Sequence, residues 1–258
     1  MTSAIHDTAP LLLEAREVTV RFGGLTAVDA VSARLHAGEL VGIIGPNGAG
    51  KTTFFNAISG VIPPTSGQLI AQGHDLTGRG PHHYAAHGIA RTFQTPRVFA
   101  HMTVADNVRF GMQFAGRHRS APAGLASVDD ILGMLGLAHL AALPAADVTP
   151  SQQRLLEIGM ALSTRPQLLL LDEVAAGLTE AEVDAMAQRI RRLRDEFRLT
   201  VVWIEHAVTT LLRYVERVIV LHQGRKIADG TPAEVVRDAQ VIEAYLGDEM
   251  ADSAEVSA

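Results

Sequence analysis

The chain has 258 residues, 47% of them hydrophobic, which is enough for one large domain or two small ones around a buried core. A formal net charge of −6 argues against a nucleic-acid binder that uses a basic surface, and the absence of cysteine excludes disulfides and cysteine-ligated metal sites. The first ten residues lack the cationic and apolar regions of a secretory signal, and no stretch reaches the ~18 uninterrupted apolar residues of a membrane span. We therefore expect no nucleic-acid partner and no membrane span.

The first 100 residues show the pattern of short strands separated by turns. Alternating polarity predicts strands over 17–22 and 31–35, and the continuous apolar run of residues 40–44 predicts a strand buried on both faces. A helix is predicted from Lys51 to Ser59, with Gly60 as its C-terminal stop. Weaker strand patterns cover residues 69–72 and 88–93.

From about Thr95 to Ala146 the composition changes to alanine, glycine, leucine and methionine at helical spacing. Thr103 and Ser127 are each followed three residues later by an aspartate, a pattern typical of helix starts. This region is therefore predicted to form a helical subdomain inserted into the sheet domain.

Buried strands are predicted again at 168–171 and 200–204, with an amphipathic helix between them. Thr179 and Glu182 have the spacing of a capping box at the start of that helix, and Thr231 and Glu234 repeat it further on. The apolar positions of the helix recur every three to four residues and form one face: Val183, Met186, Ile190, Leu193 and Phe197.

Residues 45–52 read Gly-Pro-Asn-Gly-Ala-Gly-Lys-Thr and match the pattern G-x-x-x-x-G-K-[ST] between a predicted strand and a predicted helix. The glycines let the backbone curl so that successive N–H groups point inward. Together with the positive end of the helix, these donors form an anion site for β- and γ-phosphates. Lys51 is predicted to bridge those phosphates, and the Thr52 hydroxyl to bind Mg²⁺.

An acidic pair, Asp172 and Glu173, follows the apolar run 168–171. A carboxylate at a strand end can hold Mg²⁺ directly or through water, which suits Asp172, and a second one can orient or deprotonate an attacking water, which suits Glu173. Another apolar strand is followed by Glu205 and His206. Taken singly, each pattern also fits an ordinary strand end.

The order of these motifs along the chain is that of ABC-type ATPases: residues 45–52, 91–94, 149–154, 168–173 and His206. Over nearly its whole length the chain resembles the ATP-binding subunit of branched-chain amino acid ABC importers. The segments that carry this narrower match are residues 21–28, 88–94 and 241–247.

The resemblance implies an α/β fold, the P-loop NTPase fold of an ABC-type nucleotide-binding domain. It has a RecA-like, mostly parallel sheet core, an N-terminal antiparallel β subdomain and an inserted α-helical subdomain. The domain is expected over residues 12–248, with the insertion at about 95–165 and a disordered tail at 249–258.

The resemblance also implies roles for single residues. Phe22 is expected to stack on adenine, although the residues alone leave open that it is an ordinary half-buried strand residue. Catalysis is assigned to Lys51, Gln94, Glu173 and His206, and Mg²⁺ binding to Thr52, Gln94 and Asp172. The residues expected to contact ATP are Phe22, Val28, Gly45, Pro46, Asn47, Gly48, Ala49, Gly50, Lys51, Thr52 and Thr53, and, on the ATP of a second subunit, Thr149, Ser151 and Gln152.

The signature motif departs from the family pattern. It normally reads Leu-Ser-Gly-Gly-Gln at a helix N-terminus, whereas residues 148–152 here read Val-Thr-Pro-Ser-Gln. The spacing of Thr149 and Gln152 still predicts a capped helix start. Pro150, however, has no N–H to offer, and Ser151 replaces a glycine where the backbone approaches the nucleotide. We expect the chain's own phosphate loop to be competent and the site it completes on a second subunit to be weaker.

The function implied by the resemblance is ATP hydrolysis, with ATP and Mg²⁺ as cofactors, at the cytoplasmic face of the cell membrane. It would energise import of branched-chain or other hydrophobic amino acids, with closure relayed through residues 94–103 to a permease. The expected partners are permease subunits, a second ATP-binding subunit (identical or related) and an extracytoplasmic solute-binding protein. Two alternatives remain open: an ABC ATPase for another cargo, such as a lipopolysaccharide exporter subunit, or a nucleotide-regulated scaffold that hydrolyses little ATP.

Overall fold

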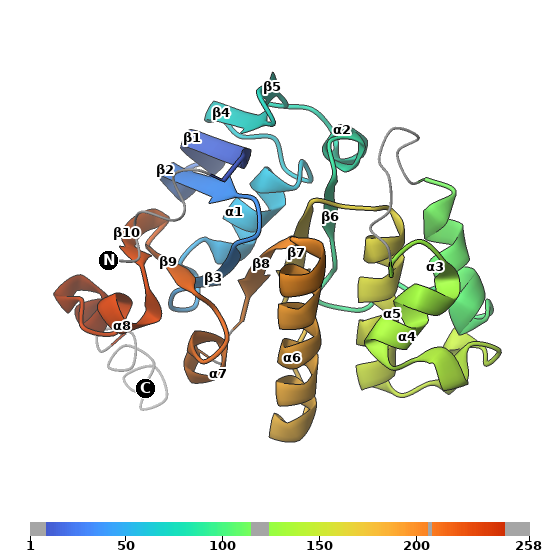
Figure 1. The fold of residues 1–258 in the computed structure, drawn as a ribbon. Coiled ribbons are helices and arrows are strands. Elements are labelled where there is room, and N and C mark those ends of the chain that lie inside the picture. The colour runs from blue at the N-terminus through green and yellow to red at the C-terminus, as the bar shows by residue number, and fades with distance from the viewer. Residues whose placement is uncertain (1–8, 115–123, 206–207, 246–258) are drawn as a thin grey trace.

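Two β-sheets organise the described part of the chain, which comprises residues 9–114, 124–205 and 208–245 of the computed structural model (Figure 1). The first sheet is antiparallel, with the strand order β2-β1-β4-β5. The second has the order β10-β9-β3-β8-β7-β6, and its strands run parallel except for β10, which pairs antiparallel with β9. The strands are β1 Leu11–Phe22, β2 Leu25–His36, β3 Leu40–Ile44, β4 Ser66–Ala71, β5 His74–Asp75, β6 Ile89–Arg91, β7 Leu168–Asp172, β8 Thr200–Ile204, β9 Arg217–His222 and β10 Arg225–Gly230.

The helices cover the second sheet and extend beyond it. Helices α3, α4 and α5 follow β6 and precede β7, and they lie together at the right of Figure 1, at the end of the molecule away from the antiparallel sheet. Within the described ranges, no helix is long and apolar enough to cross a membrane. The helices are α1 Lys51–Ile58, α2 Pro81–Ala86, α3 Val104–Met112, α4 Val128–Leu135, α5 Pro150–Ser163, α6 Glu180–Phe197, α7 Val208–Leu212 and α8 Pro232–Val235.

The central strands of the six-stranded sheet, β3, β7 and β8, are buried on both faces. In β3, Val41 and Ile43 face a cluster that includes Phe54 of α1, while Leu40 and Ile44 face a second cluster that includes helices α3 to α6. Strands covered on both sides need apolar residues at every position. This explains the continuous apolar runs in the sequence, and the strands predicted at 40–44, 168–171 and 200–204 are confirmed as β3, β7 and β8.

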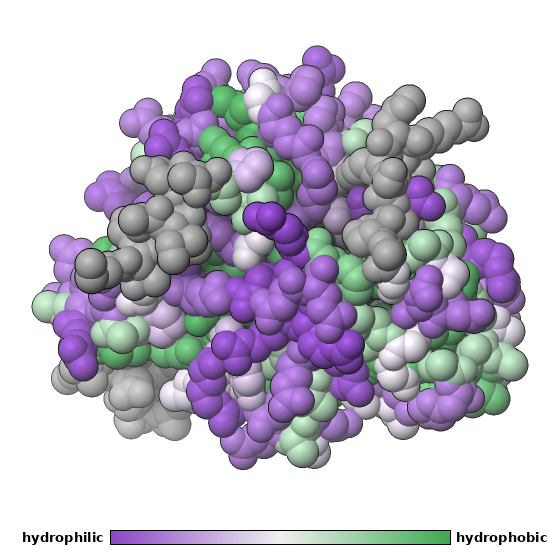
Figure 2. All heavy atoms as spheres, viewed as in Figure 1, coloured by the Kyte–Doolittle hydropathy of each residue, from purple (hydrophilic) through white to green (hydrophobic). Residues whose placement is uncertain are grey.

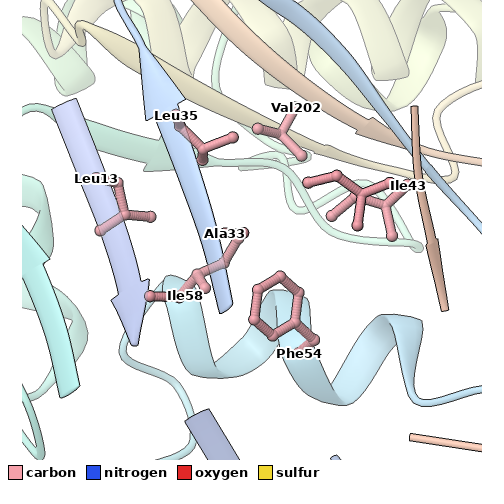
Figure 3. Close-up of a pocket in the computed structure, with 9 residues that line it drawn as sticks. Leu13, Ala33, Leu35, Ile43, Phe54, Ile58 and Val202 are labelled. Carbon is pink, nitrogen blue, oxygen red and sulfur yellow. The ribbon is translucent and has the colours of Figure 1, made fainter. Parts of the chain in front are cut away.

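A small cavity lies in the first of these clusters, between β1, β2, β3 and α1 (Figure 3). Its lining is entirely apolar and includes Leu13, Ala33, Ile43 and Phe54. A phosphate or a charged ligand would find no hydrogen-bond partner there. The cavity is therefore a gap in core packing and not a nucleotide site.

Helix starts agree well with the sequence. Five residues predicted or matched as N-caps accept a hydrogen bond from the backbone N–H three residues ahead: Thr103, Ser127, Thr149, Thr179 and Thr231. Helix α1 begins at Lys51 as predicted, and Gly60 follows its C-cap with a φ of +73°. The predicted apolar face of α6 is buried at Val183, Met186, Ile190 and Leu193.

The predictions for the first two strands were wrong in extent, since β1 and β2 each have 12 residues. Their pairing is irregular between Ala15 and Val18, where Glu17 has a φ of +46°. Such a β-bulge shifts the side-chain alternation by one residue. A second irregularity falls in β2 between Val31 and Val28, where Ala30 has a φ of +50°. Alternation therefore detected only the part of each strand that follows its own bulge.

Candidate active site

The loop of residues 45–50 connects β3 to α1 and curls tightly. Gly45, Gly48 and Gly50 have φ values of +153°, +73° and +93°, a backbone region that favours glycine. A Cβ atom at Gly45 would lie 2.0 Å from the Leu221 carbonyl oxygen, and one at Gly50 would lie 2.3 Å from that of Ala27. The loop is thus packed against its neighbours on the inside, while Asn47 and Gly48 at its rim are exposed.

Lys51 is the first residue of α1, and its side chain reaches back into this loop. Its side chain is buried, and Nζ donates hydrogen bonds to the carbonyl oxygens of Gly45, at 2.7 Å, and Pro46, at 2.8 Å. Thr52 is exposed in the first turn of α1, where no acidic residue repels an anion. A curled backbone with an exposed rim, a buried ammonium group beneath it and a helix N-terminus together fit the phosphates of a nucleotide.

The acidic pair lies at the same edge of the sheet. Strand β7 is separated from β3 only by β8, and parallel strands end on the same side. Asp172, the last residue of β7, is buried and accepts a hydrogen bond from Arg91 at 3.1 Å. Arg91 also donates to Asn56 and Ser59, so one guanidinium ties β6 to α1 and β7. Burial lowers the pKa of Arg91, an effect opposed by the charge of Asp172.

Glu173 meets Gln94 across 79 residues of sequence. Its backbone has a φ of +49°, and its N–H donates to the carbonyl oxygen of Ile204 in β8 at 3.0 Å. The buried carboxylate accepts a hydrogen bond from Gln94 Nε2 at 2.7 Å. Positive φ in a residue other than glycine is uncommon and is enriched at functional sites. The structure therefore brings together two of the residues predicted for catalysis.

His206 and its predicted role lie outside the described residues. Glu205, just before it, is buried, and its Oε1 accepts hydrogen bonds from Ala175 N at 2.7 Å and Trp203 Nε1 at 2.9 Å. Burial raises the pKa of Glu205, and these two hydrogen bonds oppose the rise. The carboxylate therefore attaches the end of β8 to the loop that follows Glu173.

Phe22 and Val28, both predicted to contact ATP, differ in exposure. Phe22, at the end of β1, is 49% exposed, so its ring has a free face for stacking. Val28 is fully buried in the core beside α1. Its side chain can support the shape of the site but presents no surface to a ligand.

The irregular signature forms the N-terminus of α5 with a complete capping box. Thr149 N donates to Gln152 Oε1 at 2.9 Å, and Gln152 N donates to Thr149 Oγ1 at 3.3 Å. The hydroxyls of Thr149 and Ser151 lie 3.0 Å apart. Pro150 occupies the first helical position without disturbing the helix. The side chains of this stretch are thus engaged in capping.

Sequence reasoning missed two residues of α5 that contact the site. Arg154 donates to the carbonyl oxygens of Gln94, at 3.3 Å, Glu173, at 3.0 Å, and Ala176, at 2.9 Å. Glu157 Oε1 accepts hydrogen bonds from the backbone N–H groups of Phe93 and Arg97. A signal was present, because Glu157 is a carboxylate between Leu156 and Ile158, where a core-facing position predicts an apolar residue.

Comparison with known proteins agrees with this arrangement. The sequence profile of the ABC transporter family matches residues 28–176, and that of the branched-chain amino acid ATP-binding cassette transporter matches residues 225–251. The chain is 37% identical to the high-affinity branched-chain amino acid transport ATP-binding protein BraF of Pseudomonas aeruginosa and 36% identical to LivG of Escherichia coli. Each alignment covers 92% of this chain and 98% of the relative.

The fold is similar to solved ATP-binding cassettes. A cassette of an ABC transporter in its ADP conformation superposes with a TM-score of 0.81 at 30% identity, over 92% of this chain and 99% of that one. A nucleotide-free cassette gives a TM-score of 0.79 at 29% identity, over 91% of this chain and 98% of that one. The expected fold class is therefore confirmed, and the chain belongs to the ABC transporter family as one of its ATP-hydrolysing, ATP-binding subunits.

Proposed function

We propose that this chain hydrolyses ATP to energise uptake of branched-chain or other hydrophobic amino acids through separate permease subunits. Membership of the family implies that the chain assembles with a membrane permease and with a second ATP-binding subunit. The choice of cargo is supported by the two relatives and by the match at residues 225–251. An extracytoplasmic solute-binding protein and a place at the cytoplasmic face of the membrane belong to the same proposal, as do the domain limits 12–248 and the insertion at about 95–165.

The contact between Gln94 and Glu173, at the sheet edge that carries the phosphate loop, is the observation that supports hydrolysis. We assign Lys51 to the β- and γ-phosphates, where its ammonium would replace its present hydrogen bonds to loop carbonyls. Glu173 would orient the attacking water and accept its proton, while the amide of Gln94 fixes the carboxylate.

The donor set also fits Mg²⁺. The exposed hydroxyl of Thr52, the carboxylate of Asp172 and the amide oxygen of Gln94 are oxygen ligands of the kind this ion prefers. When bound, the ion would neutralise charge on the phosphates. The proposal also assigns His206 to the γ-phosphate, as the sequence predicted.

A surface for the permease is proposed on α3 and the residues just before and after it. Phe99, Phe110 and Phe114 are 43%, 36% and 67% exposed, and their rings form two edge-to-face pairs with centroids 4.8 and 5.2 Å apart. Figure 2 shows hydrophobic areas interspersed with hydrophilic ones over α3 and α4, whereas the surface over α6 is mostly hydrophilic. Exposed aromatic groups of this kind are typical of protein contacts.

Transport by the reconstituted complex tests the function. With the permease and solute-binding protein in vesicles, we expect ATP-dependent uptake of labelled leucine and no uptake of labelled glutamate. Uptake of a different class of solute would contradict the proposed cargo, and nucleotide binding without phosphate release would favour the scaffold alternative.

Replacing Phe99 and Phe114 with serine should reduce uptake several-fold while ATP binding by the isolated chain stays unchanged.

The double variant Pro150→Gly/Ser151→Gly tests the irregular signature. We expect it to raise ATPase turnover of the assembled complex about 10-fold or more, because one additional N–H donor to a charged phosphate contributes about 1.5–3 kcal/mol. Phosphate release at saturating ATP measures the effect, and Pro144→Gly, in the preceding loop, serves as the control. Unchanged turnover would show that the present signature does not limit hydrolysis.

A further inference from the structure

Helix α5 holds the segment around Gln94 with two side chains on one face. Arg154 and Glu157 are three residues apart, so they are neighbours on the helix surface. Arg154 donates to the carbonyl oxygen of Gln94 at 3.3 Å. Glu157 accepts from Phe93 N at 3.3 Å and from Arg97 N at 3.0 Å. The helix therefore forms hydrogen bonds with the backbone before, at and after Gln94.

These hydrogen bonds are the main-chain attachments of the segment. Thr92 N is bonded to Leu170 in β7, and Phe99 is bonded to Asn107 in α3. Between these two anchors, the main-chain hydrogen bonds of residues 93–98 within the described part of the chain run to Arg154 and Glu157. The backbone position of Gln94 thus depends on these two side chains more than on the sheet.

Arg154 also holds the other member of the catalytic pair. The same guanidinium donates to the carbonyl oxygens of Glu173, at 3.0 Å, and Ala176, at 2.9 Å. Glu173 has a positive φ, so its carbonyl direction must be fixed by its surroundings. One side chain of α5 therefore contacts the backbone on both sides of the hydrogen bond between Gln94 and Glu173.

The surroundings of Glu157 are costly for a residue with no role beyond packing. The side chain is buried, with Arg91, Arg97 and Arg154 as the charged groups around it. Burial raises the pKa of Glu157 to about 7, although the two N–H donors and the arginines oppose the rise. The ring of Phe93 lies 4.7 Å from the Arg91 guanidinium and 4.1 Å from that of Arg97. The burial of a carboxylate here indicates that its hydrogen bonds to Phe93 and Arg97 are needed, since an apolar side chain cannot form them.

We propose that Arg154 and Glu157 are positioning residues for ATP hydrolysis, an α5 clamp that sets Gln94 against Glu173. This inference rests on the proposed roles of Gln94 and Glu173. Its consequence is that the catalytic pair follows any movement of α5. The N-terminus of α5 carries Thr149, Ser151 and Gln152, which are proposed to touch the ATP of the second subunit. The clamp would therefore connect one ATP site to the catalytic pair of the other.

Steady-state ATPase kinetics of the assembled complex test the clamp. Glu157→Leu and Arg154→Met remove the hydrogen bonds, and we expect kcat to fall about 10- to 100-fold with KM for ATP within about twofold. Glu157→Gln retains an acceptor oxygen and should keep at least about half of the wild-type kcat. Glu157→Asp keeps the charge but shortens the side chain. It should lower kcat as Glu157→Leu does, and it replaces Glu157→Leu in the test if the leucine variant does not fold.

A double-mutant comparison separates positioning from general destabilisation. In a Gln94→Ala background, Glu157→Leu should change kcat by less than about twofold, because the group it positions is already gone. The exposed pair Arg192 and Glu196 on α6 provides matched controls, Arg192→Met and Glu196→Leu, which should retain wild-type kcat.

Three results would overturn the clamp: a wild-type kcat in Glu157→Leu and Arg154→Met, a rise in KM at constant kcat, or the full loss repeated in the Gln94→Ala background. If Glu173→Gln also hydrolyses ATP normally, the proposed catalytic role of Glu173 fails as well. If Glu173→Gln is inactive while the clamp variants are active, only the clamp is wrong.

Discussion

Replacing Glu173 with glutamine is expected to leave ATP binding within about twofold and to reduce turnover by ~10²–10⁴-fold. Glutamine has the same size and can still accept a hydrogen bond from Gln94, so the local geometry is retained. It cannot accept a proton from the attacking water, and general base catalysis contributes a factor of this size. Phosphate release by the assembled complex and a binding titration with Mg-ATP measure the two effects separately.

Glu180→Gln is the matched control for this variant, since its side chain is 76% exposed at the start of α6. We expect its turnover to equal that of the wild type. Near-normal phosphate release by Glu173→Gln would refute the assignment of the base. A loss of ATP binding would instead show that the carboxylate supports the shape of the phosphate site.

The parts of the fold that the sequence predicted correctly depend on interactions between residues close together in the chain. The phosphate loop needs glycines at fixed positions between β3 and α1, and both the motif and its conformation are local. Each N-cap bond joins a side chain to a backbone N–H only three positions further along the chain. The buried strands were visible because two-sided burial confines polar residues to their ends, as at Asp172 of β7 and Thr200 of β8.

The parts that were missed depend on contacts between distant segments. Strands β9 and β10 were not predicted, although the Gln223-Gly224 turn separates an apolar run from Arg225, and β1 was shortened by its bulge. Arg154 and Glu157 are ordinary helix residues until α5 is placed against the segment after β6. The family resemblance assigned Gln94 and Glu173 separately to catalysis, but their hydrogen bond was not predicted, since no local pattern relates residues 79 apart.

The same distinction applies to the adenine side of the site. Phe22 and Val28 were chosen by position in the family pattern, which records where a residue lies in the chain but not which way it points. The structure exposes the ring of Phe22 and buries Val28 completely. A substitution at Phe22 can therefore act on nucleotide contact, whereas one at Val28 would act first on the core.

Lys51→Ala is expected to weaken binding of Mg-ATP by about 100-fold or more and to abolish measurable hydrolysis. The ammonium lies inside the curled loop, bonded to the carbonyl oxygens of Gly45 and Pro46. It is thus already placed where phosphate oxygens would replace those carbonyls, and each hydrogen bond to a charged group contributes about 1.5–3 kcal/mol. Lys51→Arg should not restore binding, because the larger planar guanidinium does not fit the same enclosure.

Lys226→Ala is the natural control, because Lys51 and Lys226 are the only lysines in the sequence. Lys226 lies on β10, where its Nζ donates to Asp229 at 2.9 Å. Both variants remove one lysine charge, so a general electrostatic effect on ATP would appear equally in the two. Equal affinities for Mg-ATP would therefore mean that the ammonium of Lys51 serves only to hold the loop carbonyls. The phosphate site would then rest on the backbone N–H groups and the N-terminus of α1 alone.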